Sequence, residues 1–197
     1  MNRFEVTTNR SYEILIGTDL LDQTGTYMRE CIDPCKICVI TDSTVNRLYA
    51  ERVISSLQKS GYQTSYIVFP AGEHSKNLET YKNILEALAE DGLSRSDALV
   101  ALGGGVVGDL TGFAASTYLR GIRYMQIPTT YLAAVDSSVG GKTGLNLNYG
   151  KNLAGAFWQP SLVICDYSTF ETLPDGIPER SGRGGQVQHD HGRQSDR

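Results

Sequence analysis

The sequence predicts an α/β fold in which a mostly parallel sheet is flanked by helices and preceded by an N-terminal β-hairpin. Two observations lead to this prediction. Short apolar runs, of the kind found in strands buried on both faces, recur along the chain, and segments whose apolar residues repeat at helical spacing lie between them. Alternation of these two kinds of segment is the pattern of parallel strands joined by helical crossovers.

The first part of this pattern opens with a loose alternation of apolar residues over residues 4–16, which indicates the hairpin or two edge strands. Residues 36–42 form a continuous apolar run and are predicted to be a buried strand. A helix is expected over residues 45–60, ended by Gly61. The side chains predicted to face inward from this helix are Leu48, Val53, Ile54 and Leu57.

In the second part, a strand over residues 66–69 is followed by a helix over residues 77–90, ended by Gly92. The apolar side chains expected on one face of that helix are Leu78, Tyr81, Ile84, Leu85 and Leu88. The remaining predicted elements are a strand over residues 98–102, a helix over residues 109–119, and strands over residues 122–127 and 161–165.

Composition excludes several classes of protein. The 197 residues include 18 Lys and Arg against 22 Asp and Glu, and the net charge of −4 argues against a nucleic-acid-binding protein. Hydrophobic residues make up 40% of the chain, which is ordinary for a globular domain, and no apolar run is long enough to span a bilayer. The N-terminus does not resemble a signal peptide, and four cysteines do not make a disulfide framework, so we expect a cytoplasmic protein.

The strongest local signal is a glycine-rich turn between a predicted strand and a predicted helix. Gly103, Gly105 and Gly108 form a G-x-G-x-x-G pattern in the context that this motif requires. Such glycines let the backbone approach a pyrophosphate, whose charge is met by the helix N-terminus. The ribose-binding acid expected about 20 residues later is missing, and Asp42 at the end of an earlier strand is a better candidate. An N-cap role for Asp42 is an equal alternative.

Residues 136–143 nearly spell an ATP-binding P-loop, but Asp136 stands where the first glycine belongs. Its carboxylate would repel the phosphates, and no strand leads directly into the segment, so we reject a nucleotide triphosphatase. A small-residue loop carrying Lys142 is predicted instead. Together with Lys151 and Asn152 it could bind an anionic, oxygen-rich ligand, although solvated surface lysines are the alternative.

Two further groups of residues have side chains that can carry chemistry. Residues 73–76, with Glu73 and Lys76, place ionisable groups after a strand, and Ser75 is an alternative N-cap for the next helix. Three cysteines, Cys31, Cys35 and Cys38, have the spacing of a radical iron–sulfur site. Cys38 lies inside an apolar strand, so we interpret the three as buried thiols.

Residues 178–197 differ in composition from the rest of the chain, with Val187 as their only aliphatic residue. His189 and His191 lie here, and a metal-binding pair is one interpretation of them. The polar composition favours a disordered tail. We therefore predict one α/β domain over residues 1–177 and a separate polar tail.

Taken together, these segments resemble the 3-dehydroquinate synthase family, and they follow that family's order over about residues 1–177. The matching stretches are residues 42–45, 70–76, 102–115, 126–130, 136–144, 150–152 and 172–174. The resemblance implies a Rossmann-like, NAD-binding domain. The residues that it implies as NAD contacts are Asp42, Glu73, Lys76, Gly104, Gly105, Val106, Asp109, Thr129, Thr130, Thr169 and Thr172. Those that it places toward the substrate are Asp136, Lys142, Lys151, Asn152 and Arg120.

The activity implied by the resemblance is that of a lyase of the shikimate pathway, which serves chorismate and aromatic amino acid biosynthesis. Such an enzyme converts DAHP, a seven-carbon keto acid phosphate, into 3-dehydroquinate and phosphate. NAD oxidises one alcohol, phosphate leaves, the ketone is reduced again, and an aldol step closes the ring. A transient ketone acidifies the neighbouring C–H, so phosphate can leave without a strong base. The expected partner is this small substrate, with no nucleic acid or membrane, and the full-length family implies a homodimer.

The family also uses a divalent metal, zinc or cobalt, held in a helical C-terminal domain. Its metal-binding glutamate should follow Leu173-Pro174 closely, and its two histidines much later, but residues 183–186 are Arg-Gly-Gly-Gln and the sequence ends soon after. We assign no metal ligand in this chain and expect the chain alone to be inactive. A change of reading frame is our hypothesis for the tail, because residues 184–193, back-translated and read one nucleotide later, permit a peptide like the family's metal-binding segment.

Two other functions stay open on the sequence. One is a different sugar-phosphate cyclase or a glycerol-dehydrogenase-like enzyme, which trial substrates would separate. The other is a non-catalytic NAD-binding module, which would bind NAD without turnover.

Overall fold

The computed structural model describes residues 1–8 and 10–173. Its main sheet has seven strands in the order β1-β2-β9-β6-β5-β3-β4. In that order the strands are Asn2–Val6, Tyr12–Gly17, Leu162–Asp166, Arg123–Pro128, Ala98–Gly103, Lys36–Asp42 and Gln63–Phe69. Every neighbouring pair is parallel except the β1–β2 hairpin. The predicted fold class and the N-terminal hairpin are confirmed.

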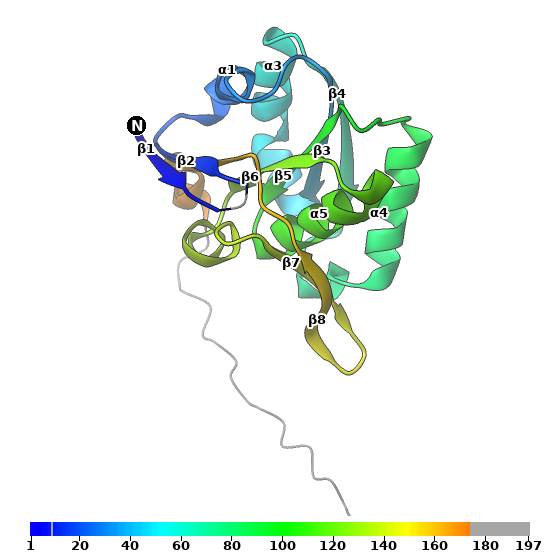
Figure 1. Cartoon of the computed structure of the whole chain (residues 1–197). Coiled ribbons are helices and arrows are strands. Elements are labelled where there is room, and N and C mark those ends of the chain that lie inside the picture. The colour runs from blue at the N-terminus through cyan, green and yellow to red at the C-terminus, as the bar shows by residue number, and fades with distance from the viewer. Residues whose placement is uncertain (9, 174–197) are drawn as a thin grey trace, which may run out of the picture.

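Helices cover both faces of this sheet, as Figure 1 shows. On one face lie α1 (Thr24–Arg29) and α3 (Glu51–Lys59), and on the other lie α4 (Leu78–Glu90) and α5 (Gly105–Thr117). Central strands between these layers, such as β3 and β5, are therefore buried on both sides. This arrangement explains the continuous apolar runs of the sequence.

Strand β3 shows how one segment serves both cores. Consecutive side chains of a strand point to opposite faces, so Ile37 and Val39 pack in the core that contains Val53 of α3. Cys38 and Ile40 pack in the other core, beneath α4 and α5. These four side chains of β3 are each at most 1% exposed. Burial on this scale contributes roughly 1.5–3 kcal/mol for each large aliphatic side chain.

The direction of winding reverses at β3. From this strand the chain passes through α3 to β4 on one side, and then through α4 to β5 on the other side. The loops after β3 and β5 therefore leave in opposite directions, and α/β sheets of this kind bind ligands at that point. In the ladder Thr41 lies beside Leu102, which places Asp42 next to Gly103.

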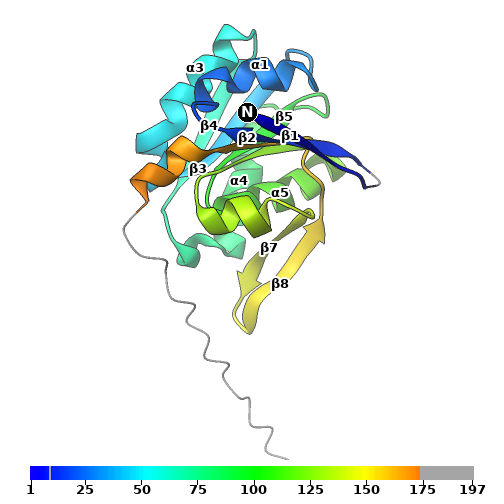
Figure 2. The same cartoon turned by 90° about the vertical axis from the view of Figure 1, so that its left-hand side faces the viewer.

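A second, two-stranded sheet lies against α5 (Figure 2). Its strands β7 (Lys142–Leu147) and β8 (Gly150–Phe157) form an antiparallel ribbon. The ribbon packs so closely that a Cβ on Gly112 of α5 would lie 2.4 Å from Thr143 Cγ2. The expectation of a loop at Lys142 is therefore wrong. Gly144 and Gly155 permit the close approach of the two backbones of the ribbon.

The predicted helix over residues 45–60 consists of three consecutive segments. They are α2 (Ser43–Val45), the π-helical turn η2 (Asn46–Ala50) and α3. The wider turn of η2 changes which side chains face the core, so Leu48, expected to be inward, is 45% exposed. Leu78 is also wrongly predicted: it is the first residue of α4 and is 57% exposed.

Two further elements differ from the prediction. Helix α5 begins at Gly105 rather than at residue 109, because its glycine-rich first turn is helical and not part of the loop. The short segment formed by η1 (Leu21–Gln23) and α1 was not predicted, since it is too brief to show a clear period. None of the described helices is long and apolar enough to cross a bilayer. The predicted tail over residues 178–197 lies outside the described residues.

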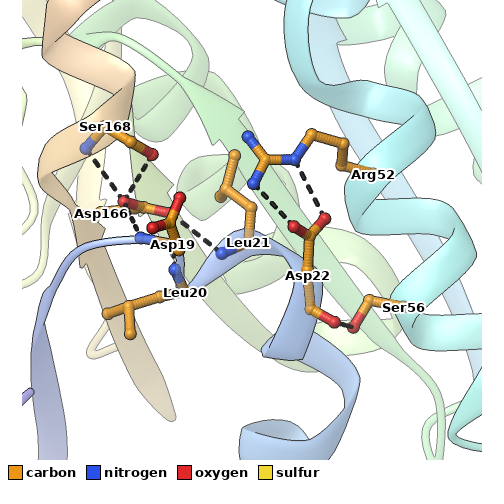
Figure 3. Close-up of polar contacts among 8 residues, drawn as sticks. All are labelled: Asp19, Leu20, Leu21, Asp22, Arg52, Ser56, Asp166 and Ser168. Carbon is orange, nitrogen blue, oxygen red and sulfur yellow. Dashed lines mark hydrogen bonds and ion pairs between the residues drawn. The ribbon is translucent and has the colours of Figure 1, made fainter.

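A buried carboxylate, Asp166, ends β9 and fixes the segment that follows it (Figure 3). Its oxygens accept hydrogen bonds from the backbone N–H groups of Asp19, Leu20, Leu21 and Ser168 and from the Ser168 hydroxyl, at 2.7–3.0 Å. Asp166 thereby joins the start of η1 to η6 (Tyr167–Thr172), which carries Thr169 and Thr172. An exposed ion pair nearby, Asp22 with Arg52, joins η1 to α3 at 2.8 Å.

We predict that Asp166→Asn lowers the free energy of unfolding by about 2–3 kcal/mol, because an amide nitrogen would face backbone N–H donors and leave them buried without an acceptor. Urea unfolding followed by circular dichroism measures this loss. The matched control is Asp22→Asn, whose exposed pair with Arg52 should be worth less than about 1 kcal/mol. Equal losses in the two variants would contradict the prediction.

Candidate functional site

The N-terminus of α5 is the centre of the candidate site, because it follows the carboxyl end of β5 directly. Gly104 caps the helix in an extended conformation and offers no side chain to the first turn. The first N–H groups of a helix lack intrahelical acceptors, so here they stay available to a ligand. A helix N-terminus of this kind favours a phosphate or another anion.

The loop after β6 borders this helix end. Thr129 N donates to the last carbonyl of β5 at 3.0 Å. A Cβ on Gly104 would lie 3.3 Å from Thr130 Cγ2, and one on Gly105 would lie 3.4 Å from Ser137 Oγ. That Ser137 oxygen is buried and has no hydrogen-bond partner in the described part of the chain. The two glycines thus form a cradle in which the backbone is accessible from the site.

Asp42 has the N-cap role that the sequence offered as an alternative. Its Oδ1 accepts hydrogen bonds from Thr44 N at 2.8 Å and Val45 N at 3.0 Å. Both bonds use one carboxylate oxygen, so capping and ribose binding are compatible. Asp42 lies beside Gly103 at the carboxyl edge of the sheet, where α/β folds bind ligands, and its role in ribose binding stays a prediction.

Thr169 and Thr172 are tied to the segment that follows Asp42. Tyr49 OH donates to Thr169 O at 3.1 Å and lies 2.5 Å from Thr172 Oγ1. The Thr169 hydroxyl donates to Asp166 O at 2.8 Å, and its side chain is fully buried. The structure therefore brings η6 to η2, and cofactor contact through these threonines stays a prediction.

A buried ammonium group joins three elements of the site. Lys76 is 5% exposed, and its Nζ donates to Asp109 Oδ2 of α5 and to Asn152 Oδ1 of β8, 2.5 Å away. Burial raises the pKa of the Asp109 carboxyl above its ordinary value, and the Lys76 ammonium opposes that rise. Ion pairs this buried hold their partners firmly, because a lone buried charge is costly.

The segment before Lys76 is shaped by bonds other than those predicted. Ser75 does not cap α4: its hydroxyl donates to Pro70 O at 2.6 Å. Asn77 is the cap, and its Oδ1 accepts a hydrogen bond from Thr80 N, in the third residue of the helix, at 2.9 Å. Glu73 Oε1 accepts from Asn146 Nδ2 at 2.8 Å. Lys76 is thus held between a short 3₁₀ turn and the capped end of a helix.

A cavity of about 430 Å³ lies between the ribbon and the start of α5. Its polar lining comes from Asp109, Asp136, Ser137, Lys142, Thr143 and Asn152. Lys142 Nζ lies 3.4 Å from Asp136 Oδ1, and both side chains are more than 60% exposed. A larger cavity between α3 and β4 is lined by none of the predicted site residues. We therefore assign substrate binding to the cavity between the ribbon and α5.

Two predicted substrate residues do not line this cavity. Lys151 has a side chain that is 72% exposed, with Nζ 3.7 Å from Glu73 Oε1. Arg120 follows the C-terminal end of α5, in η4 (Tyr118–Arg120), where its φ is +66°. Within this chain the structure does not bring Arg120 to the lysines with which it was grouped. Its role stays a prediction.

The three grouped cysteines differ in exposure. Cys38 is buried in β3, and burial raises its pKa to about 11. Cys35 is half-buried, whereas Cys31 is exposed, so its prediction as a buried thiol is wrong. Residues 1–8 and 10–173 contain no group of three or more His, Cys, Asp or Glu placed to hold a metal.

Sequence reasoning missed Asn146 and Ser137. Asn146 bonds to Glu73, which lies 73 positions earlier, so no local pattern could reveal the contact. Ser137 was part of the near-P-loop segment, but its proximity to Gly105 depends on how two loops meet in space. The one feature of the sequence that could have indicated Ser137 as a site residue is its position next to Asp136.

Comparison with known proteins gives a consistent result. A model of the 3-dehydroquinate synthase N-terminal region matches residues 66–178. A 3-dehydroquinate synthase from Enterococcus faecalis is 53% identical over 163 residues, and one from Thermodesulfovibrio yellowstonii is 52% identical over 166 residues. These matches cover 83% and 84% of this chain, but 46% of each relative. The chain therefore spans about half the length of the curated relatives it matches.

Solved structures of related cyclases share the fold. A 2-deoxy-scyllo-inosose synthase in complex with carbaglucose-6-phosphate, NAD⁺ and Co²⁺ superposes with a TM-score of 0.80 at 31% identity, covering 88% of this chain and 48% of that one. A 2-epi-5-epi-valiolone synthase from Streptomyces hygroscopicus with NAD⁺ and Zn²⁺ bound has a TM-score of 0.76 at 30% identity, covering 87% and 47%. A glycerol dehydrogenase from Schizosaccharomyces pombe has a TM-score of 0.64 at 17% identity, which shows the fold alone.

We predict that Lys76→Met lowers the free energy of unfolding by about 3 kcal/mol at pH 8, because it leaves the Asp109 carboxylate buried without its counter-ion. The folded-state pKa of Asp109 is already raised, so its ionisation opposes folding as pH rises, and the variant lacks the ammonium that limits this effect. The deficit should shrink toward pH 4.5, where the carboxyl becomes protonated.

Urea unfolding at the two pH values measures this deficit. The control is Lys142→Met, which removes an exposed ion pair and should change stability by less than about 1 kcal/mol at either pH. A Lys76→Met deficit that does not depend on pH would count against the Asp109 pair as its cause.

Proposed function

This chain belongs to the 3-dehydroquinate synthase family, and we propose that it forms the NAD-binding part of an enzyme that converts DAHP into 3-dehydroquinate and phosphate. The observation that carries the proposal is the open N-terminus of α5, placed next to Asp42 where the winding of the sheet reverses. About 50% identity to 3-dehydroquinate synthases supports this activity over that of the sister cyclases, which are near 30% identical.

The residues at this edge fit a dinucleotide. Gly104 and Gly105 would let the backbone of α5 approach the pyrophosphate, and the first helical N–H groups would meet its charge. Asp42 would accept from a ribose hydroxyl with the oxygen that capping leaves free. The unpartnered Ser137 hydroxyl offers one more donor beside Gly105.

The cavity between α5 and the ribbon would then take the substrate. Lys142 at its wall and the exposed Lys151, which precedes the lining residue Asn152 in the chain, would neutralise the carboxylate and phosphate of DAHP. Asn152 would orient substrate hydroxyls, and Asp136 would hold the Lys142 ammonium in position. Arg120 remains a further candidate for an anionic group of the substrate, although it lies away from this cavity in one copy of the chain.

NAD, when bound, would accept hydride from one substrate alcohol and return it later, so that the cofactor is regenerated. The protein's own part is to orient the substrate and stabilise charge. The ketone formed acidifies the adjacent C–H, and fixed ammonium groups favour the charge that develops as phosphate leaves. Lys76 would keep Asp109 and Asn152 at the junction of the two subsites.

The divalent metal of the family does not fit the residues described here. They contain no cluster of His, Cys, Asp or Glu suited to a metal ion, and we derive no step through one. His189 and His191 lie outside the described part of the chain.

We predict that Gly105→Ala weakens NAD binding at least tenfold, because the added methyl group obstructs the approach of the pyrophosphate to the helix. The fold should be unaffected, since the new Cβ has an ordinary contact with Ser137 and alanine favours helix. Calorimetric titration with NAD measures the affinity. Lys142→Ala is the control and should change it less than threefold, and equal losses would refute the division into two subsites.

We also predict that residues 1–173 of this chain, joined to the corresponding C-terminal part of the Enterococcus faecalis relative, release phosphate from DAHP with NAD and zinc present. No net NADH should accumulate, because the hydride is returned. Phosphate release and absorbance at the NADH band are the two measurements. Net NADH from glycerol, without phosphate release from DAHP, would favour a dehydrogenase instead, and NAD binding with neither reaction would favour a non-catalytic module.

A further inference from the structure

The β7–β8 ribbon contains an irregularity at the substrate-facing residues. Leu145 pairs with Ala154 and Leu147 with Gly150, so one residue on β7, Asn146, lies opposite three on β8. The extra residues form a bulge over positions 151–153. Bulges bend a strand and re-aim side chains, and they are frequent beside active sites.

The side chain of Asn146 replaces the hydrogen bond that the bulge removes from the ladder. Its Oδ1 accepts from Asn152 N at 2.9 Å, and Asn152 has a φ of +56°, the left-handed region that is strained for most residues. Without the Asn146 side chain, the backbone N–H of Asn152 would have no hydrogen-bond acceptor on β7. The amide of Asn146 therefore supports an unusual backbone conformation at a predicted substrate residue.

Asn146 also contacts the segment with Glu73 and Lys76, two of the predicted NAD-binding residues. Asn146 Nδ2 donates to Glu73 Oε1 at 2.8 Å, and Asn146 N donates to Lys76 O at 2.9 Å. Asn152, fixed by Asn146, then accepts from Lys76 Nζ with its own side chain. Asn146 thus contacts both segments that meet at the Lys76 ammonium.

We propose that Asn146 is a positioning residue that holds the bulge at Asn152 and the turn at Glu73 in one arrangement, so that the NAD-binding and substrate-binding residues are set together. The inference rests on the proposed function for the identity of the two ligands. It assigns Asn146 no contact with either of them. Its role is to orient Asn152 through the backbone and Glu73 through the side chain.

Two variants separate the two hydrogen bonds of the Asn146 side chain, and a third variant is their control. Asn146→Ala removes both of them. Asn146→Asp keeps an oxygen to accept from Asn152 N but places a second carboxylate against Glu73. Asn148→Ala, in the exposed turn of the same ribbon, is the matched control.

The first readout is amide hydrogen exchange measured by NMR, which needs no ligand. We expect the Asn152 amide of Asn146→Ala to exchange at least tenfold faster, with the amides of β5 unchanged. In Asn146→Asp at pH 7 the Asn152 amide should stay protected, and Asn148→Ala should match the parent chain. An unchanged Asn152 amide in Asn146→Ala, its exposure in Asn146→Asp, or faster exchange throughout the sheet would overturn the proposal.

The second readout is the affinity for NAD. Both Asn146→Ala and Asn146→Asp should bind NAD at least fivefold more weakly, because each loses the bond that holds Glu73, while Asn148→Ala should not. Unchanged affinity in both Asn146 variants would overturn the link to the nucleotide side. If the parent chain itself does not bind NAD, the proposed function fails, and the exchange experiment still decides whether Asn146 holds the bulge.

Discussion

A buried ammonium group needs oxygen partners close by, and this requirement at Lys76 organises the whole candidate site. Its partners come from α5 and from the ribbon, whereas Lys76 itself follows β4. Separating any of these elements would leave a charge without its partner in a poorly solvated place, which is strongly unfavourable. The ion pair therefore fixes how the ribbon, the helix and the turn at Glu73 meet, and the cavity exists because they meet there.

The edge of the sheet supplies the other half of the site. Because β4 and β5 lie on opposite sides of β3, the loops that follow β3 and β5 diverge beside Asp42 and Gly103. Helix α5 starts in that space with no side-chain cap. The sheet topology and the Lys76 pair thus place an anion-binding helix end next to a cavity that the exposed Lys142 lines.

Much of this arrangement was predictable from the sequence, where the signals are local. Buried strands such as β3 and β5 show continuous apolar runs, and Gly103 to Gly105 mark the turn into α5. What could not be predicted depends on contacts between distant segments. The segment with Lys142 was taken for a loop because the pairing of Lys142 with Phe157 leaves no local signal in the sequence, and the π-helical turn that exposes Leu48 has no sequence signature either. Asn146 was missed because its partner Glu73 is far away in the chain.

The central claim is that the N-terminus of α5 and the adjacent strand ends bind a dinucleotide. An NMR titration of the isotopically labelled chain with NAD tests it most directly, since every backbone amide reports separately. The account predicts saturable shifts of the amides of Gly104, Gly105 and Val106, with smaller shifts at Thr129 and Thr130. No saturable shift at these residues, or shifts confined to the cavity between α3 and β4, would contradict it.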